Sequence, residues 1–287
     1  RYSSTTKVYR DEQSGELGGL TRVLSITQDD AHVFCREGQI KDEFLKIWDI
    51  VEKFYNTFGF SLKARLSFRN LEEPEKYLGT PLIWNNAEKI LRTIAEERGA
   101  DYFEGPGEAA LYGPKLDFMA KNSAGREWQV ATIQLDMNLP ERFDLTCINE
   151  KGEKERITMI HAAIAGSLER CAAILIEHFA GAFPLWLSPV QVKVIPVRTN
   201  HNEYAKEVFE LLKENNIRAE LDDADENLGS RVRDAKTNKI PYWIVIGDKE
   251  IEAQKVTLES RDSGNLGQMS KEDLLSKLLT EIKEKKN

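Results

Sequence analysis

Two arginines and a glutamate near the start of the chain have the chemistry of a phosphate-binding site. Arg10 and Glu12 lie two residues apart in a segment expected to be a strand, so alternation places both side chains on one face of a sheet. Arg22 follows the glycine-rich stretch SGELGG, on the second arm of the strand–loop–strand hairpin that we predict here. A surface ion pair is the more common role of Arg10 and Glu12 alone. Arg22 adds positive charge to the same patch, which makes phosphate the natural ligand.

Another arginine and two histidines are further candidates. Arg170 lies in HAAIAGSLERCAAILIEHF, a predicted helix that is apolar on most sides. A guanidinium there needs a partner, and a buried carboxylate and a bound ligand explain it equally well. His32 and His161 are far apart in the sequence. Neutral imidazole is a good zinc ligand, but most single histidines beside apolar neighbours are hydrogen-bonded core residues, so spacing alone favours the structural role.

Periodic apolar residues predict the elements that must position these side chains. The apolar stripe of residues 40–58 predicts a long amphipathic helix, and residues 62–69 alternate as in a strand with one buried and one polar face. A second helix is predicted over 81–98, between Pro81 and Gly99. The segments KLDFMA and REWQVATIQLDM then predict two strands, and their short connection indicates antiparallel pairing.

The pattern changes beyond Pro189. An apolar stripe over residues 164–179 predicts one more helix, and prolines follow it. Strands and helices then alternate to the end, where Ser270 and Asp273 resemble a capping box of the last helix. Such alternation is typical of a small, mainly parallel α/β domain. We therefore predict two domains, residues 1–188 and 189–287.

Composition limits the class of protein. The 287 residues, 41% of them hydrophobic, are enough for about two packed domains. A net charge of −8 argues against a uniformly basic coat for nucleic acid, although a local basic groove is compatible with it. Cys35, Cys147 and Cys171 indicate neither a disulfide framework nor a zinc ribbon, and no apolar run approaches the ~18 residues of a membrane span. We expect a soluble protein of a reducing compartment, the cytoplasm, with no membrane partner.

Five segments resemble one enzyme family. YRDEQSGELGGLTRVLSITQDDAHVFC resembles motif 2 of the threonyl-tRNA synthetases, a class II family, and HAAIAGSLERCAAILIEHFAGAFPLWLSPVQV resembles their motif 3. ALYGPKLDF, WQVATIQLD and IPYWIVIGDKEIE are similar to further segments of that family, in the same order. The resemblance implies a class II catalytic domain of α+β type, built on an antiparallel sheet, followed by a small α/β anticodon-binding domain.

The resemblance also implies an activity and its residues. A member of this family is a threonine–tRNA ligase, which forms threonyl-adenylate from threonine and ATP with Mg²⁺ and transfers threonine to tRNA(Thr). Arg10 and Arg170 match catalytic residues. The positions that match ATP-binding residues are Arg10, Glu12, Arg22, Gln129, Thr132 and Arg170. Those that match the threonine pocket are Gln28, Asp30, Tyr112, Lys115, Gln134 and Ser167, and those that match anticodon contacts are Arg231, Arg233, Lys239 and Glu250.

The family binds Zn²⁺ through three protein ligands, two of which match His32 and His161. The third is a cysteine that precedes motif 2, a place that none of the three cysteines of this chain occupies. The chain starts at Arg1, inside motif 2, so we expect a longer, homodimeric protein that also contains motif 1. A truncated synthetase-like module that binds tRNA or regulates a partner, without adenylation activity, is the alternative. The retained arginines and histidines favour the ligase.

Overall fold

A computed structural model describes residues 1–224 and 226–287, which form two compact units, Arg1–His178 and Phe179–Asn287. The boundary predicted after residue 188 falls in the segment that leads into the first strand of the second unit. None of the helices in these described ranges has the length and apolar character needed to cross a membrane.

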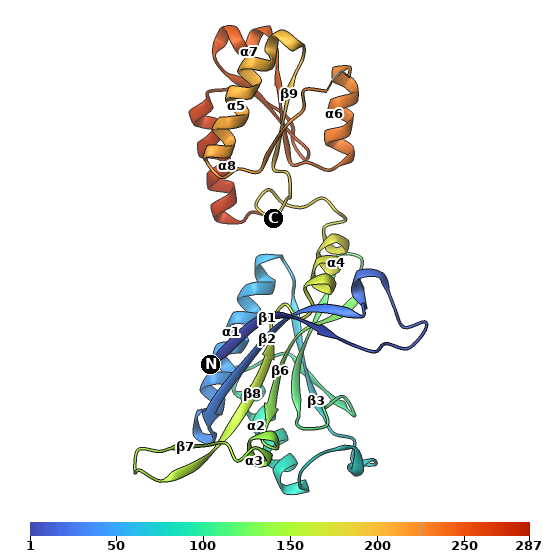
Figure 1. Ribbon diagram of the computed structural model, residues 1–287, viewed down its shortest axis with the longest axis vertical. Coiled ribbons are helices and arrows are strands. Elements are labelled where there is room, and N and C mark those ends of the chain that lie inside the picture. The colour runs from blue at the N-terminus through green and yellow to red at the C-terminus, as the bar shows by residue number, and fades with distance from the viewer. Residues whose placement is uncertain (225) are drawn as a thin grey trace. The chain divides into compact units, whose positions relative to one another are not determined.

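An eight-stranded sheet forms the centre of the first unit (Figure 1). Its order is β1-β2-β8-β6-β5-β3-β4, with β7 paired to β8, and only β3 and β4 run parallel. The antiparallel pairing of β5 with β6 confirms the prediction from their short connection. The strands are β1 (Tyr2–Tyr9), β2 (Ser25–Arg36), β3 (Leu62–Phe68), β4 (Tyr102–Pro106), β5 (Lys115–Lys121), β6 (Glu127–Asp136), β7 (Thr146–Ile148) and β8 (Lys154–Ala163).

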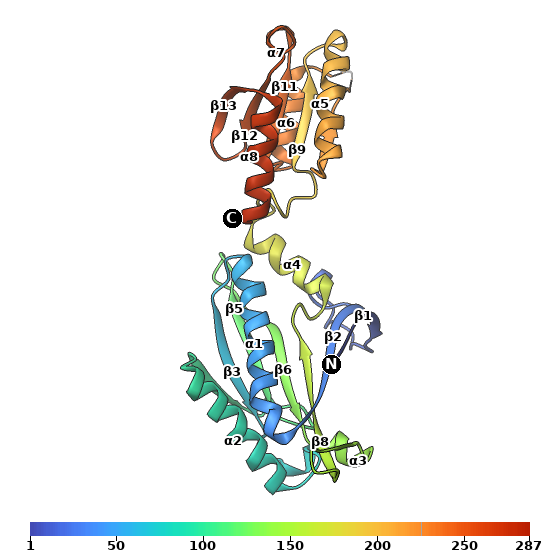
Figure 2. The ribbon, with the colours of Figure 1, turned by 90° about the vertical axis from the view of Figure 1, so that its left-hand side faces the viewer.

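Helices α1 (Ile40–Thr57) and α2 (Pro81–Arg98) cover one face of this sheet (Figure 2). The Trp48 ring of α1 meets the edge of Phe118 on β5, with ring centroids 5.4 Å apart. Because side chains alternate along a strand, the neighbouring Asp117 points to the opposite face. The opposite face is therefore free to carry polar groups. Shorter elements complete the unit, namely α3 (Leu139–Arg142), α4 (Leu168–His178) and the 3₁₀ turns η1 (Gly19–Thr21), η2 (Glu37–Gln39) and η3 (Pro74–Lys76).

Local signals account for the ends of α2. The Thr80 hydroxyl accepts a hydrogen bond from the backbone NH of Ile83, Pro81 occupies the first turn, and Gly99 follows the last turn with a φ of 66°. The helix therefore begins and ends where the sequence predicts.

One expectation about a strand is wrong. β1 ends at Tyr9, where its pairing with β2 ends, so Arg10 and Glu12 follow the strand in the loop instead of lying on it. The polar side of β3 is exposed at Lys63 but shielded from solvent beyond it. Ser67 has no exposed surface, and the side chain of Arg65 is only 15% exposed. Both side chains pack against groups from the neighbouring strands.

The second unit is a five-stranded sheet between helices (Figure 1). Its order is β10-β9-β11-β12-β13; the first three strands run parallel, and the last two add antiparallel pairs. Helices α5 and α8 lie on one face and α6 on the other. The elements are β9 (Val192–Pro196), η4 (Thr199–His201), α5 (Asn202–Glu214), β10 (Ala219–Leu221), α6 (Leu228–Thr237), β11 (Tyr242–Ile246), α7 (Asp248–Ala253), β12 (Val256–Ser260), β13 (Gly264–Met269) and α8 (Lys271–Glu284).

The predicted fold class is confirmed: an α+β unit with a largely antiparallel sheet precedes a smaller α/β unit. The Ser270 cap of α8 is present as expected, since its hydroxyl accepts a hydrogen bond from the backbone NH of Asp273 at 3.0 Å.

Candidate active site

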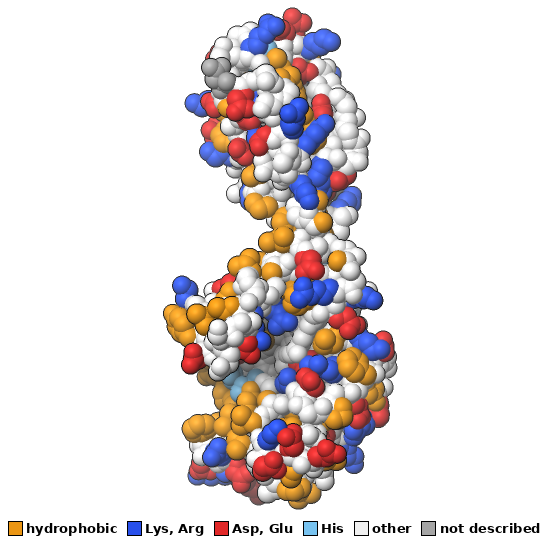
Figure 3. All heavy atoms as spheres, turned by 90° about the vertical axis from the view of Figure 1, so that its right-hand side faces the viewer, with side chains coloured by type: hydrophobic (Ala, Val, Ile, Leu, Met, Phe, Trp, Pro, Cys, Tyr) orange, Lys and Arg blue, Asp and Glu red, His pale blue; other side chains and the backbone are white. Residues whose placement is uncertain are grey.

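A cavity of about 700 Å³ lies in the first unit, lined by the β1–β2 hairpin, by strands β2, β5, β6 and β8, and by α4. Figure 3 shows the hollow, with histidine side chains at its floor and Lys and Arg side chains beside it. The cavity gathers every residue that the sequence suggested for ATP, threonine or a metal. They are Arg10, Glu12, Arg22, Gln28, Asp30, His32, Tyr112, Lys115, Gln129, Thr132, Gln134, His161, Ser167 and Arg170.

The hairpin supplies two of the cations. Arg22 forms ion pairs with Glu12 at 2.8 Å and with Glu16 at 3.2 Å, and the hydrogen bond from Arg22 holds the pKa of the Glu12 carboxyl below its usual range. Arg10 is exposed, and its guanidinium has no hydrogen-bond or ion-pair partner among the described residues. The two arginines therefore differ: Arg22 is held by carboxylates, and Arg10 is available to an anion.

Arg170 extends from α4 toward the same end of the cavity. Its Nε is buried and has no hydrogen-bond partner within the described part of the chain, and its guanidinium lies 5.3 Å from the Trp128 ring centroid. Burial and then the neighbouring Arg10, Arg126 and Arg22 lower the pKa of Arg170. No carboxylate among residues 1–224 and 226–287 forms an ion pair with it. A bound anion is thus the better of the two explanations for this arginine.

His32 and His161 are direct partners in the pairing of β2 with β8, and their ring centroids are 4.7 Å apart. Behind them, Asp136 is fully buried and its Oδ2 lies 3.0 Å from Nε2 of His161. With that carboxylate as acceptor, Nε2 carries the proton and Nδ1 keeps a free lone pair, an arrangement common for metal-binding histidines. The described residues contain no group of three or more His, Cys, Asp or Glu that could hold a metal ion. The pair therefore fits as two ligands of a site that needs more.

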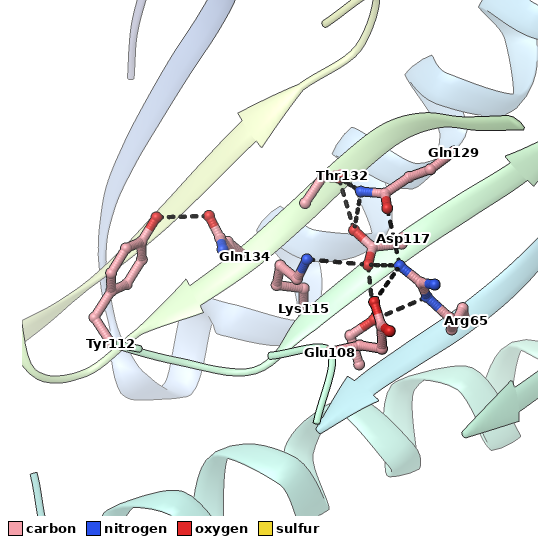
Figure 4. Close-up of polar contacts among 9 residues, drawn as sticks. Arg65, Glu108, Tyr112, Lys115, Asp117, Gln129, Thr132 and Gln134 are labelled. Atoms are coloured by element: carbon pink, nitrogen blue, oxygen red, sulfur yellow. Dashed lines mark hydrogen bonds and ion pairs between the residues drawn. The ribbon is translucent and has the colours of Figure 1, made fainter. Parts of the chain in front are cut away.

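The Tyr112 hydroxyl donates a hydrogen bond to Oε1 of Gln134 at 2.7 Å (Figure 4). Burial, together with Asp136 and Asp30, raises the pKa of Tyr112 to about 12, so the phenol stays a neutral donor. The next residue, Gly113, approaches β6 so closely that a Cβ there would lie 1.9 Å from the carbonyl oxygen of Leu135. Only glycine fits this approach, which brings Tyr112 beside Gln134.

Two carboxylates that sequence reasoning missed tie β2 to the start of α4. Asp29 accepts hydrogen bonds from the backbone NH groups of Ile164 and Ala165, each at 2.8 Å. Glu169 accepts from the backbone NH of Thr27 with both oxygens, at 3.0 Å, and from the Ser167 hydroxyl at 3.0 Å. The backbone partners of Asp29 and Glu169 lie more than 130 residues away, so hydrophobic periodicity carries no signal for them.

Comparison with known proteins identifies the family. The tRNA synthetase class II core domain of the G, H, P, S and T enzymes matches residues 1–179, and an anticodon-binding domain matches residues 191–281. The chain belongs to the class II tRNA synthetases. The resemblance of motif 2 and motif 3 is thereby confirmed, and the cavity lies within the synthetase core.

Relatives of the whole chain include threonyl enzymes. The chain is 47% identical to the threonine–tRNA ligase of Carboxydothermus hydrogenoformans and 48% identical to that of Caldanaerobacter subterraneus subsp. tengcongensis, over 97% and 96% of its length. It spans 43% and 42% of those two proteins. The crystal structure of the RNA binding domain of threonyl-tRNA synthetase from Cryptosporidium parvum Iowa II is 35% identical, with a TM-score of 0.90, and the match covers 97% of this chain and 69% of that one.

In the second unit, the four residues that match anticodon contacts have different surroundings. Arg233 and Lys239 are exposed, and Lys239 bonds to the carbonyl oxygen of Ala180. Glu250 is half-buried and caps α7, accepting from the backbone NH of Gly247 at 2.9 Å and from the Thr257 hydroxyl at 2.7 Å. Arg231 is only 4% exposed, and its guanidinium donates to the carbonyl oxygens of Asp222 and Val197. A direct RNA contact thus stays a prediction, and burial favours a structural role for Arg231.

We expect Glu169 to stabilise the synthetase core in a pH-dependent way. Hydrogen bonds from Thr27 hold the pKa of its carboxyl at about 2, below the usual 4.5, so its stabilisation is present above pH 4.5 and is lost as the pH falls toward 2. Glu169→Gln should therefore weaken the acid dependence of the thermal unfolding midpoint. Glu127→Gln, at the exposed start of β6, is the matched control. An identical acid dependence in wild type and Glu169→Gln would contradict this assignment.

Proposed function

We propose that this chain carries the adenylating centre and anticodon-binding domain of a threonine–tRNA ligase, which activates threonine with ATP and transfers it to tRNA(Thr). The supporting observation is one cavity in which Arg10, Arg22 and Arg170 meet the Tyr112–Gln134 pair and two histidines. Threonine, ATP and tRNA(Thr) are the partners that this proposal implies. A cytoplasmic homodimer is the assembly that the family resemblance favours for the complete protein.

The chemistry follows from the distribution of charge. In adenylate formation a carboxylate oxygen of threonine attacks the α-phosphorus of ATP, an O–P bond forms, and the bond to the departing pyrophosphate breaks. Negative charge increases on the phosphate oxygens in the transition state, and fixed guanidinium groups stabilise it without reorganising. Arg10, whose guanidinium has no partner among the described residues, suits the α-phosphate, and the half-buried Arg170 suits the outer phosphates. When bound with ATP, Mg²⁺ neutralises part of this charge.

The main alternative is a synthetase-like module that binds tRNA without making adenylate. Such a module does not account for the half-buried Arg170, whose Nε has no hydrogen-bond partner among the described residues and whose charge is repelled by Arg10, Arg126 and Arg22. An arrangement of this kind destabilises the fold unless an anion binds. The surroundings of Arg170 therefore support the enzyme over the binding module.

His32 and His161 would hold a zinc ion together with a ligand that the described residues do not supply. Such an ion would recognise the amino and hydroxyl groups of threonine and so reject valine, which lacks the hydroxyl. The orientation of His161 by Asp136 supports this part of the proposal.

Arg10→Ala should lower threonine-dependent exchange of pyrophosphate into ATP by roughly 10²-fold in the full-length protein, because one electrostatic stabiliser of the transition state is lost. Lys7→Ala is the matched control, since Lys7 is exposed on β1 and outside the cavity. Exchange by Arg10→Ala at the level of the control would show that Arg10 does not bind the reacting phosphate.

Zinc binding is tested by metal content. The full-length protein should retain zinc after dialysis, and His161→Ala should lose it together with the preference for threonine over valine. Loss of both from a folded His161→Ala protein supports the site. Tight zinc retention by that variant would show that His161 is a core histidine.

The anticodon-binding role is tested by two arginines of α6. Arg233→Ala should weaken tRNA charging and reduce its salt dependence, while threonine-dependent exchange stays unchanged, because Arg233 is exposed in the second unit. Arg231→Ala should instead lower stability by about 1–3 kcal/mol, since it leaves two partly buried carbonyl groups without this donor. Normal tRNA charging by Arg233→Ala would exclude a contribution of this residue to RNA binding.

A further inference from the structure

A buried carboxylate lies behind the wall of the cavity. Asp117 on β5 has no exposed surface, and neither it nor Arg65 lines the cavity. Strand register puts Arg65 of β3 opposite Asp117, and Asp117 opposite Thr132 of β6. A cation, a carboxylate and a hydroxyl therefore lie side by side on three neighbouring strands, on the face that α1 does not cover (Figure 4).

Both oxygens of Asp117 are saturated. Oδ2 accepts from Arg65 Nη2 at 2.9 Å and from the Ser67 hydroxyl at 2.7 Å, and Lys115 Nζ lies 3.3 Å away. Oδ1 accepts from Gln129 Nε2 at 2.9 Å and from the Thr132 hydroxyl at 2.7 Å. Three of these five donors, Lys115, Gln129 and Thr132, line the cavity. Asp117 thus connects the cavity wall to the sheet behind it.

These contacts fix where the protons of Gln129 and Thr132 point. Oε1 of Gln129 accepts from Arg65 at 2.8 Å, so Nε2 is turned to Asp117 and to the Thr132 oxygen, 3.1 Å away. Both protons of that amide are then used, and the single hydroxyl proton of Thr132 goes to Asp117. Gln129 and Thr132 consequently offer the cavity only oxygen lone pairs.

The neighbouring part of the cavity wall offers hydrogen-bond donors instead of acceptors. Gln134 accepts the Tyr112 hydroxyl with Oε1, so its NH₂ group is left to donate, and the ammonium of Lys115 is also a donor. A ligand here needs donor groups against Gln129 and Thr132, and acceptor groups against Lys115 and Gln134.

We propose that Asp117 is a positioning residue that, with Arg65, holds Gln129 and Thr132 as hydrogen-bond acceptors for hydroxyl or amino groups of the nucleotide. Asp117 does not touch the ligand. It acts through two side chains whose protons it binds, and a carboxylate is needed because only an ionised one accepts from every donor around it. This inference rests on the proposed function in taking ATP as the ligand.

Asp117→Asn removes the negative charge and puts an NH₂ group among donors. In one orientation of the amide Gln129 and Thr132 lose their acceptor, and in the other Arg65, which holds Oε1 of Gln129, loses its acceptor. The variant of the full-length protein should raise the KM for ATP about tenfold in threonine-dependent exchange, the effect of losing one well-made polar contact, while kcat changes less. Asp101→Asn is the matched control, because Asp101 is exposed just before β4. A folded Asp117→Asn protein with the KM of the control would overturn the proposal.

A double-mutant cycle separates positioning from general structural support. Thr132→Val, which removes the hydroxyl at constant shape, should also raise the KM for ATP about tenfold in the wild-type background. In the Asp117→Asn background it should add little, because the hydroxyl is already misdirected. Effects that multiply to about a hundredfold would show that the two residues act independently, against the proposal.

Arg65→Lys provides a second route if Asp117→Asn does not fold. Lysine keeps the charge beside Asp117 but cannot reproduce the guanidinium contacts to both Asp117 and Gln129, so the Gln129 amide loses its fixed orientation. The KM for ATP should rise several-fold, and an unchanged KM would count against the proposal. Absence of threonine-dependent exchange in the wild type would refute the proposed function itself, and exchange in the wild type with unaltered variants would refute only the role of Asp117.

Discussion

The buried carboxylate of Asp117 is the constraint on which the core sheet depends. A desolvated carboxylate is tolerated only when charge and hydrogen bonds surround it, and here those groups come from three strands in register. A slip of one residue between β3 and β5 would turn Asp117 or its partners toward the apolar face under α1. The strand register therefore determines both the side chains that form the cavity wall and those that pack in the core under α1.

At the arginine end of the cavity, by contrast, most of the charge is not balanced by protein groups. There the described residues bring Arg10, Arg22 and Arg170 together, but only Arg22 has carboxylate partners. The lowered pKa of Arg170 reports burial and repulsion by its neighbours, which a bound polyphosphate would relieve. The chain is acidic as a whole, with a net charge of −8, so the positive charge of this end is local. The charge of Asp117 is thus balanced by groups of the protein itself, whereas the charge of Arg170 is left for a bound ligand to balance.

Much of the fold could be predicted from sequence, because apolar periodicity and capping residues act locally. The helix over residues 81–98 and the cap at Ser270 are examples. β3 shows the limit of that reasoning. Its alternation was correct, but a polar side of a strand looks the same whether it faces water or a buried carboxylate. The partner of Arg65 is 52 residues away on β5, and no local pattern contains that pairing.

In the candidate site, too, some residues could be predicted from the sequence and others could not. Resemblance to the family named the residues that line the cavity, and it overlooked the carboxylates behind them, because isolated Asp and Glu in a sequence are most often solvated. Each hidden carboxylate orients a different group: Asp29 the backbone before α4, Asp136 the ring of His161, and Asp117 the Gln129 and Thr132 side chains. Without these carboxylates, the residues that line the cavity would not show which of their polar groups donate hydrogen bonds and which accept them. With them, each side chain is either a donor or an acceptor, and the wall selects ligands by the placement of their protons.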